Sequence, residues 1–153
     1  MKDKYEPAED KKLNEIYEKE EKLSTVPGLE LLEAEANELY RNGKFAVAFQ
    51  IYLNIFETDK TNLRTILQMV GCREKMGDFE GAEEICDLAF EIYPGEPHVY
   101  ITSGKLNLRQ NNLEAALEDF KTGKELGSEF CEEMFNRLKN EMGYNDGNVP
   151  TIA

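Results

Sequence analysis

Apolar residues recur along the chain with the spacing of amphipathic helices, and the whole pattern returns every 34 residues. The segments that carry it are 40–52, 74–86 and 108–120. Gly43, Gly77 and Asn111 occupy the same place in these segments. Glycine and asparagine tolerate the positive φ that a chain needs where a helix ends and turns back. The period therefore predicts stacked units, each a helix, a short turn and a second helix.

When the three units are aligned at their turns, further sets of equivalent residues appear in the helices before and after the turn. We call each set a column. After the turn come a large apolar residue, then an alanine, then a residue one helical turn below that alanine. These columns are Phe45, Phe79 and Leu113; Ala48, Ala82 and Ala116; and Tyr52, Cys86 and Phe120. The helix before the turn has the columns Leu32, Ile66 and Tyr100, and Ala36, Val70 and Gly104. The small residues predict places where two helices approach closely.

The segment 128–143 predicts a closing helix. Its apolar residues fall on one helical face and are Cys131, Met134, Phe135, Leu138 and Met142. Ser128 is suited to cap its start and Gly143 its end. A final helix of this kind covers the apolar side of the last repeat in stacked arrays. We expect residues 28–143 to form one repeat domain and residues 144–153 to be a disordered tail.

Residues 1–27 predict a charged amphipathic helix and a linker. Leu13, Ile16, Tyr17 and Leu23 recur at helical spacing, and "STVPG" at 24–28 separates them from the repeats. This helix has three possible roles: packing on the array, self-association into a homodimer, or remaining mobile.

At these columns the chain resembles the tetratricopeptide repeat (TPR) family, over residues 29–128. The repeated large-x-x-Ala pattern after the turn is its most specific part. The usual closing proline is replaced by Lys60 in the first unit and Ser128 in the third. The resemblance implies an all-α fold, an α-solenoid of three TPR helix-turn-helix repeats with an extra N-terminal helix and a C-terminal capping helix.

The chain also resembles the class II chaperones of bacterial type III secretion, which keep hydrophobic translocator proteins soluble before export. The likeness rests on "GCREKMG" at 71–77, "GEPHVY" at 95–100, the repeat number, the extra N-terminal helix and the acidic composition. It implies a cytoplasmic chaperone or adaptor. The alternative is a structural scaffold subunit that uses its N-terminal helix or outer faces.

In the TPR family the first helix of each unit lines a concave groove that binds an extended or helical peptide. Carried onto this sequence, the groove residues are Asn37, Tyr40, Arg41, Arg64, Leu67, Gly71, Glu74, Lys75, His98, Ile101, Lys105, Leu108 and Arg109, with Glu30 and Glu33 beside them. Basic residues outnumber acidic ones in this set, and Tyr40, Leu67, Ile101 and Leu108 add an apolar strip. A partner with a few apolar anchor residues would suit such a surface.

One branch of the family clamps the C-terminal carboxylate of heat-shock chaperones with lysine, asparagine and arginine side chains. The matching positions here are Glu33, Asn37, Gln68, His98 and Thr102. Only Asn37 agrees, and the carboxylate of Glu33 would repel the ligand. This function is disfavoured.

Net charge and the spacing of the cysteines narrow the possible ligands, compartment and cofactors. A net charge of -13 disfavours nucleic acid and anionic membranes as ligands, because phosphate binding needs clustered basic residues. No stretch is long and apolar enough to cross a bilayer, so membrane insertion is not expected. The three cysteines form no C-x-x-C pair, which predicts a reducing, cytoplasmic compartment and no bound metal or other cofactor.

No catalytic constellation emerges from the sequence. His98 is the one histidine and has no nucleophile motif nearby, so it is expected to be a surface or groove residue. Cys86 is expected in the core and Cys72 at a half-buried position; a functional pair of these thiols is the minor alternative. The sequence therefore predicts a protein that binds other proteins and is not an enzyme.

Overall fold

The computed structural model describes residues 28–143, so the predicted N-terminal helix with most of its linker and the predicted tail lie outside the described residues. The described part contains seven α-helices and no strand. They are α2 (Leu29–Arg41), α3 (Phe45–Thr58), α4 (Leu63–Lys75), α5 (Phe79–Ile92), α6 (Pro97–Arg109), α7 (Leu113–Glu125) and α8 (Glu129–Glu141). The all-α expectation and the order of helix-turn-helix units are confirmed.

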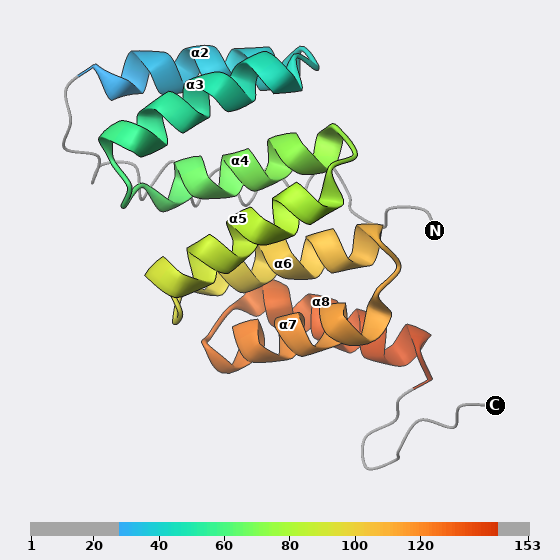
Figure 1. The fold of residues 1–153 in the computed structure, drawn as a ribbon. Coiled ribbons are helices and arrows are strands. Elements are labelled where there is room, and N and C mark those ends of the chain that lie inside the picture. Colours follow the sequence, from blue (N-terminus) through green and yellow to red (C-terminus); the bar gives the residue numbers. More distant parts are fainter. Residues whose placement is uncertain (1–27, 144–153) are drawn as a thin grey trace. The chain divides into compact units, whose positions relative to one another are not determined.

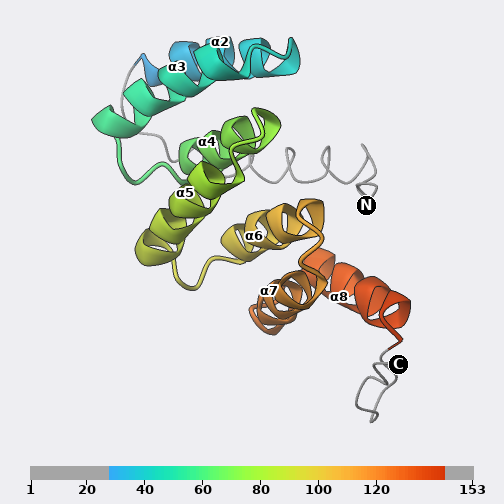
Figure 2. The same cartoon turned by 45° about the vertical axis from the view of Figure 1, so that its right-hand side comes forward.

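The described helices belong to two compact units, which meet in sequence between Ile92 and Tyr93. Unit one contains α2 to α5, and each helix packs against the next one in the chain. Unit two contains α6, α7 and α8, packed in the same consecutive way. Figures 1 and 2 show the helices of each hairpin lying side by side from both directions.

The predicted turns have the predicted backbone conformation. Gly43 has φ of 77°, Gly77 has φ of 79°, and Asn111 has φ of 60°. In residues 28–143, Asn111 is the one residue other than glycine with positive φ. Asparagine accepts this left-handed conformation more readily than most side chains, which explains why it replaces glycine in the third turn.

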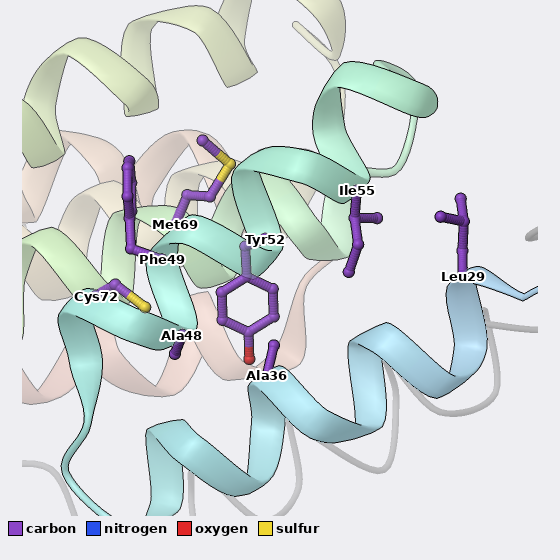
Figure 3. Close-up of a cluster of buried hydrophobic side chains, with 8 residues drawn as sticks. All are labelled: Leu29, Ala36, Ala48, Phe49, Tyr52, Ile55, Met69 and Cys72. Atoms are coloured by element: carbon purple, nitrogen blue, oxygen red, sulfur yellow. The ribbon is translucent and has the colours of Figure 1, made fainter.

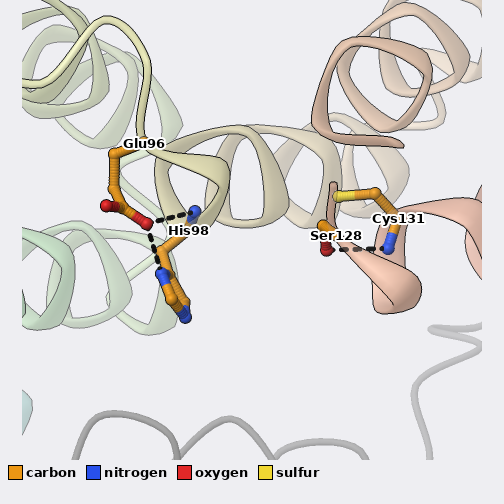
Figure 4. A network of polar contacts seen from close by, with 4 residues as sticks. All are labelled: Glu96, His98, Ser128 and Cys131. Atoms are coloured by element: carbon orange, nitrogen blue, oxygen red, sulfur yellow. Dashed lines mark hydrogen bonds and ion pairs between the residues drawn. The ribbon is translucent and has the colours of Figure 1, made fainter. Parts of the chain in front are cut away.

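Side-chain caps begin several helices. The Oδ1 atom of Asn62 accepts a hydrogen bond from the backbone N–H of Thr65 at 3.1 Å, at the start of α4. The hydroxyl of Ser128 accepts one from the backbone N–H of Cys131, also at 3.1 Å, at the start of α8 (Figure 4). Such bonds satisfy backbone donors that have no partner within the helix. The predicted cap at Ser128 is confirmed.

The core of unit one forms where α2, α3 and α4 meet (Figure 3). Its buried residues are Leu29, Ala36, Ala48, Phe49, Tyr52, Ile55, Met69 and Cys72. Tyr52 is fully buried, and its hydroxyl donates a hydrogen bond to Oδ1 of Asn37 on α2. A buried hydroxyl without such a partner would be costly, so this bond fixes how α3 sits on α2.

The core of unit two depends on two glycines within helices. A β-carbon at Gly104 on α6 would lie 2.7 Å from the ring of Phe120 on α7. A β-carbon at Gly123 on α7 would collide with the sulfur of Cys131 on α8. Both contacts need glycine, because a side chain would push the helices apart.

The three cysteines are free and buried. Cys86 is 3 % exposed and takes the core position predicted for it. Cys72 is fully buried and belongs to the core of unit one, so the prediction of a half-buried position is wrong. The reason is that α4 packs between α3 and α5, so this face of α4 has no solvent-exposed side.

Candidate functional site

The predicted groove residues all lie on the first helices of the hairpins. α2 and α4 contribute eight of them to unit one: Asn37, Tyr40, Arg41, Arg64, Leu67, Gly71, Glu74 and Lys75. α6 contributes five to unit two: His98, Ile101, Lys105, Leu108 and Arg109. We call these two sets the α2–α4 face and the α6 face.

An ion pair joins the two helices of the α2–α4 face. Nε of Arg64 on α4 lies 3.2 Å from Oε1 of Glu33 on α2. Both side chains are largely buried, at 13 % and 6 % exposure. Removing either partner from a pair this buried would leave an uncompensated charge. Arg64 therefore has a structural role that the sequence did not reveal, and much of its charge is neutralised by Glu33.

Tyr40 and Gly71 make a second contact across this face. The Tyr40 hydroxyl lies 3.1 Å from the position that a β-carbon on Gly71 would occupy. The Tyr40 ring also meets Phe45 edge to face, with centroids 5.1 Å apart. A glycine inside a helix costs about 0.5–1 kcal/mol relative to alanine. Gly71 thus gives the α4 backbone room for the Tyr40 side chain, which is half-buried.

Asn37 has a structural partner as well. Its Oδ1 atom accepts a hydrogen bond from the Tyr52 hydroxyl, so this oxygen is already bonded to a residue of the core. Asn37 was the single position that agreed with the carboxylate clamp, and Glu33 of that clamp pattern is buried beside Arg64. The side chains of this face therefore do not form such a clamp.

Two basic residues of the α2–α4 face are exposed. Arg41 pairs with Glu38 on the same helix at 2.7 Å, an exposed pair of the kind that contributes little stability. Arg41 also lowers the pKa of the Glu38 carboxyl, through a hydrogen bond and its charge. Lys75 is exposed at the end of α4, next to the half-buried Glu74.

His98 on the α6 face contacts Glu96, the residue that precedes the first turn of α6. The carboxylate of Glu96 lies 2.6 Å from Nδ1 of His98 and accepts the His98 backbone N–H at 3.4 Å (Figure 4). A carboxylate is an acceptor, so this geometry places a proton on Nδ1. His98 is only 8 % exposed, so of the two expected positions, surface or groove, the surface position is wrong. Lys105 and Arg109, further along α6, are half-buried.

The predicted apolar strip is largely buried. Leu67 is 7 % exposed, Ile101 3 % and Leu108 5 %. Tyr40 is the member of the strip that stays partly accessible. Three of the four side chains of the predicted apolar strip are therefore buried in the structure. Binding through Leu67, Ile101 or Leu108 requires their side chains to become accessible.

Metal ligands, apolar helices and thiols were checked in the described residues. Within 28–143, no group of three or more His, Cys, Asp and Glu side chains is placed to hold a metal ion. No helix in the same stretch is long and apolar enough to cross a membrane. Burial raises the pKa of the Cys72 thiol to about 12, which disfavours the reactive thiolate.

Two polar arrangements were not predicted from the sequence. The Asp119 carboxylate on α7 accepts hydrogen bonds from Ser103 at 2.7 Å and from Asn107 at 2.8 Å, both on α6. The guanidinium of Arg73 on α4 lies 4.1 Å from the ring centroid of Phe49 on α3. The 34-residue repeat indicates which helix each of these residues belongs to. It does not indicate which side chains meet, because that depends on how neighbouring helices cross.

The sequence matches no protein-family profile and no curated protein. Solved structures resemble it clearly. The Yersinia enterocolitica type III secretion chaperone SycD, in complex with a peptide of the translocator YopD, matches 76% of this chain and 96% of its own, with 20% identity and a TM-score of 0.65. The Sgt2 TPR domain from Aspergillus fumigatus matches 84% of this chain and 92% of its own, with 17% identity and a TM-score of 0.66.

A third similar structure is the first TPR of Spaghetti bound to an HSP90 peptide. It matches 75% of this chain and 95% of its own, with 19% identity and a TM-score of 0.65. Both suggested resemblances, to TPR domains and to translocator chaperones, thus reappear among the similar structures. At these identities the likeness establishes the fold. The chain has the helical-hairpin fold of TPR domains.

Proposed function

We propose that this protein is a peptide-binding chaperone or adaptor whose α2–α4 face and α6 face each contact a segment of a partner protein. The observation that carries the proposal is a fold shared with TPR domains, two of which were solved with a bound peptide. In this role the protein acts by holding its partner.

The chemistry of the two faces indicates the kind of partner. The whole chain carries a net charge of -13, but Arg41 and Lys75 are exposed on the α2–α4 face and Lys105 and Arg109 are half-buried on the α6 face. A partner segment with carboxylates between apolar anchor residues would find opposite charge here and meet repulsion elsewhere. Affinity would come mainly from a few anchors that become buried, with Tyr40 as their contact on this chain.

The similarity to SycD supports a more specific role. We propose a cytoplasmic chaperone of type III secretion that keeps a hydrophobic translocator soluble before export. Co-expression tests this role: the partner should appear in the soluble fraction with the full chain and in the membrane or pellet fraction without it. A partner that is equally soluble alone contradicts the chaperone role and leaves an adaptor role standing.

Affinity capture tests the binding proposal itself. The tagged full chain is used to capture proteins from the cells that express it naturally, and captured proteins are identified by mass spectrometry. Aspartate at Leu67 or Ile101 would disrupt the fold itself, because both side chains are buried. Exposed positions are better probes.

A double variant, Arg41→Glu with Lys75→Glu, reverses the exposed charge on the α2–α4 face. We expect it to lose the captured partner while its circular dichroism stays unchanged. Lys121→Glu is the matched control, because Lys121 is an equally exposed lysine on α7. If the double variant captures as well as the control, the α2–α4 face is not the binding surface.

A further inference from the structure

The closing helix α8 continues the repeat pattern of the first helices of the hairpins. The residues 34 positions after Ile101, Lys105 and Leu108 of the α6 face are Phe135, Lys139 and Met142. Figures 1 and 2 show α8 beside α7, with which it packs in unit two. We call Phe135, Lys139 and Met142 the α8 face. The groove residues predicted from the sequence end at Arg109 on α6, so this face lies outside the predicted site.

The apolar side chains of the α8 face are partly accessible. The buried side of α8 consists of Cys131, Met134 and Leu138, at 0 %, 2 % and 5 % exposure. Phe135 and Met142 lie next to this side and are only half-buried. Leu67 and Ile101, which hold the place of Phe135 on α4 and α6, are 7 % and 3 % exposed. The apolar column that is buried on α4 and α6 is therefore partly open to a ligand on α8.

Two lysines border the ring of Phe135. The Nζ atom of Lys124 on α7 lies 5.0 Å from the ring centroid, and Nζ of Lys139 on α8 lies 5.9 Å from it. Both distances fall within the range of about 6 Å over which an ammonium group is attracted to an aromatic ring. Lys124 is exposed and Lys139 is half-buried. An accessible ring with two positive charges beside it is thus present in a chain of net charge -13.

The residue at position 124 differs from its equivalents in the earlier units. α3 and α5 have Phe56 and Phe90 in this column, and both rings are half-buried. Lys124 instead places an ammonium group beside Phe135. In the last hairpin an aromatic ring is therefore replaced by a positive charge at the border of the α8 face. Apolar surface and positive charge are combined here.

We propose that the α8 face binds an apolar residue of the partner segment on Phe135 and pairs a neighbouring carboxylate of that segment with Lys124 and Lys139. This inference rests on the proposed function and adds a third face with a defined ligand chemistry. Burial of the apolar residue would exclude water from the ring and strengthen the attraction between the carboxylate and the two ammonium groups. The acidic remainder of the chain repels such a segment, so the two lysines also determine where it docks.

A library of random peptides displayed on phage, selected on the full chain, tests this chemistry without knowledge of the natural partner. We expect the selected peptides to carry aspartate or glutamate next to a large apolar residue. The most enriched peptide is then synthesised with a fluorescent label and serves as the probe. Its affinity for the wild type and for each variant is measured by fluorescence polarisation.

Reversing the charge beside Phe135 should weaken binding of the probe. We expect Lys124→Glu to lower its affinity by at least about fivefold, because a carboxylate then faces the carboxylate of the peptide. Lys60→Glu is the matched control, since Lys60 is an exposed lysine on the turn between α3 and α4 and belongs to none of the three faces. It makes the same change in net charge and should alter the affinity by less than about twofold.

Two further variants test the anchor and the sign of the charge. Phe135→Ala should weaken binding by at least about tenfold in a protein whose circular dichroism is unchanged. Glu132, one helical turn before Phe135, is an exposed carboxylate on the same side of α8. Glu132→Gln removes it and should tighten binding, whereas equal or weaker binding would count against a carboxylate docked at this face.

The possible failures can be told apart. If the wild type selects no peptide above background, the proposed peptide-binding function is overturned. If the probe binds the wild type, Lys124→Glu and Lys60→Glu equally well, peptide binding stands and the α8 face is not part of the binding surface. Because Lys124 is exposed, its variant gives this result even if Phe135→Ala fails to fold.

Discussion

Gly104 on α6 and Phe120 on α7 lie so close that a β-carbon at Gly104 would come within 2.7 Å of the ring. The same two columns in unit one hold Ala36 and Tyr52, which pack together in the core (Figure 3). An alanine is therefore tolerated opposite an aromatic ring in one hairpin and not in the other. The difference indicates that Gly104 allows α6 and α7 to approach more closely.

Gly104→Ala should destabilise the protein. Alanine favours the helix by about 1 kcal/mol, but overpacking a fixed core costs about 1–3 kcal/mol. We expect a net loss of about 1 kcal/mol in the free energy of unfolding, measured by equilibrium urea denaturation. Phe120→Leu should partly relieve the loss in the double variant. A Gly104→Ala variant more stable than the wild type would contradict the close packing.

The cap at Asn62 should contribute measurably to stability. Its side chain accepts the Thr65 N–H, whereas Asn112 at the start of α7 makes no such side-chain bond. Asn62→Ala should therefore lower the free energy of unfolding by about 1 kcal/mol, and Asn112→Ala by clearly less. Urea denaturation of the two variants side by side compares the same chemical change with and without the cap. Equal losses would show that the hydrogen bond at Asn62 is not the cause.

The three cysteines should be inert in the folded protein. Burial raises the pKa of Cys72 to about 12 and also raises that of Cys131, and Cys86 is buried as well. Reaction with a thiol reagent at pH 8 should be at least about tenfold slower than after unfolding in urea, because the thiolate is the reacting form. One thiol that reacts rapidly in the native protein would revive the functional-cysteine alternative.

Asp119 should make stability depend on pH in the acid range. Burial raises its pKa above the usual 3.8, although the hydrogen bonds from Ser103 and Asn107 oppose this. The folded state then binds the proton more tightly than the unfolded chain, so this group favours folding most below pH 3.8. Its contribution is lost as the pH rises through the raised value.

Asp119→Asn removes that dependence and keeps an oxygen that can accept both hydrogen bonds. Relative to the wild type, the variant should therefore gain stability between pH 4 and pH 7, as followed by thermal unfolding at each pH. A difference between the two proteins that is constant across this range would mean that Asp119 does not titrate abnormally.

The sequence predicted the helices and turns well because each signal is local. A glycine or asparagine every 34 residues marks the turns, and Ser128 begins α8 as expected. These features depend on backbone conformation and on neighbours within one helical turn. They need no knowledge of how helices cross.

The candidate site was predicted less well because exposure depends on packing between helices. Leu67 has the same local pattern whether it faces solvent or a neighbouring element, and it proved to be buried. The sequence predicted that Arg64 contacts a bound peptide. In the structure its Nε atom lies 3.2 Å from Oε1 of Glu33 on another helix. Sequence spacing identifies a face of a helix, and the neighbouring helices determine what that face does.

Hydrogen exchange with mass spectrometry tests the central claim of peptide binding most directly. The full chain is compared alone and with a synthetic peptide from the partner obtained by affinity capture. Protection on binding should concentrate on α2, α4 and α6, which carry the proposed faces. Protection confined to α3, α5, α7 or α8, with these three helices unchanged, would contradict it.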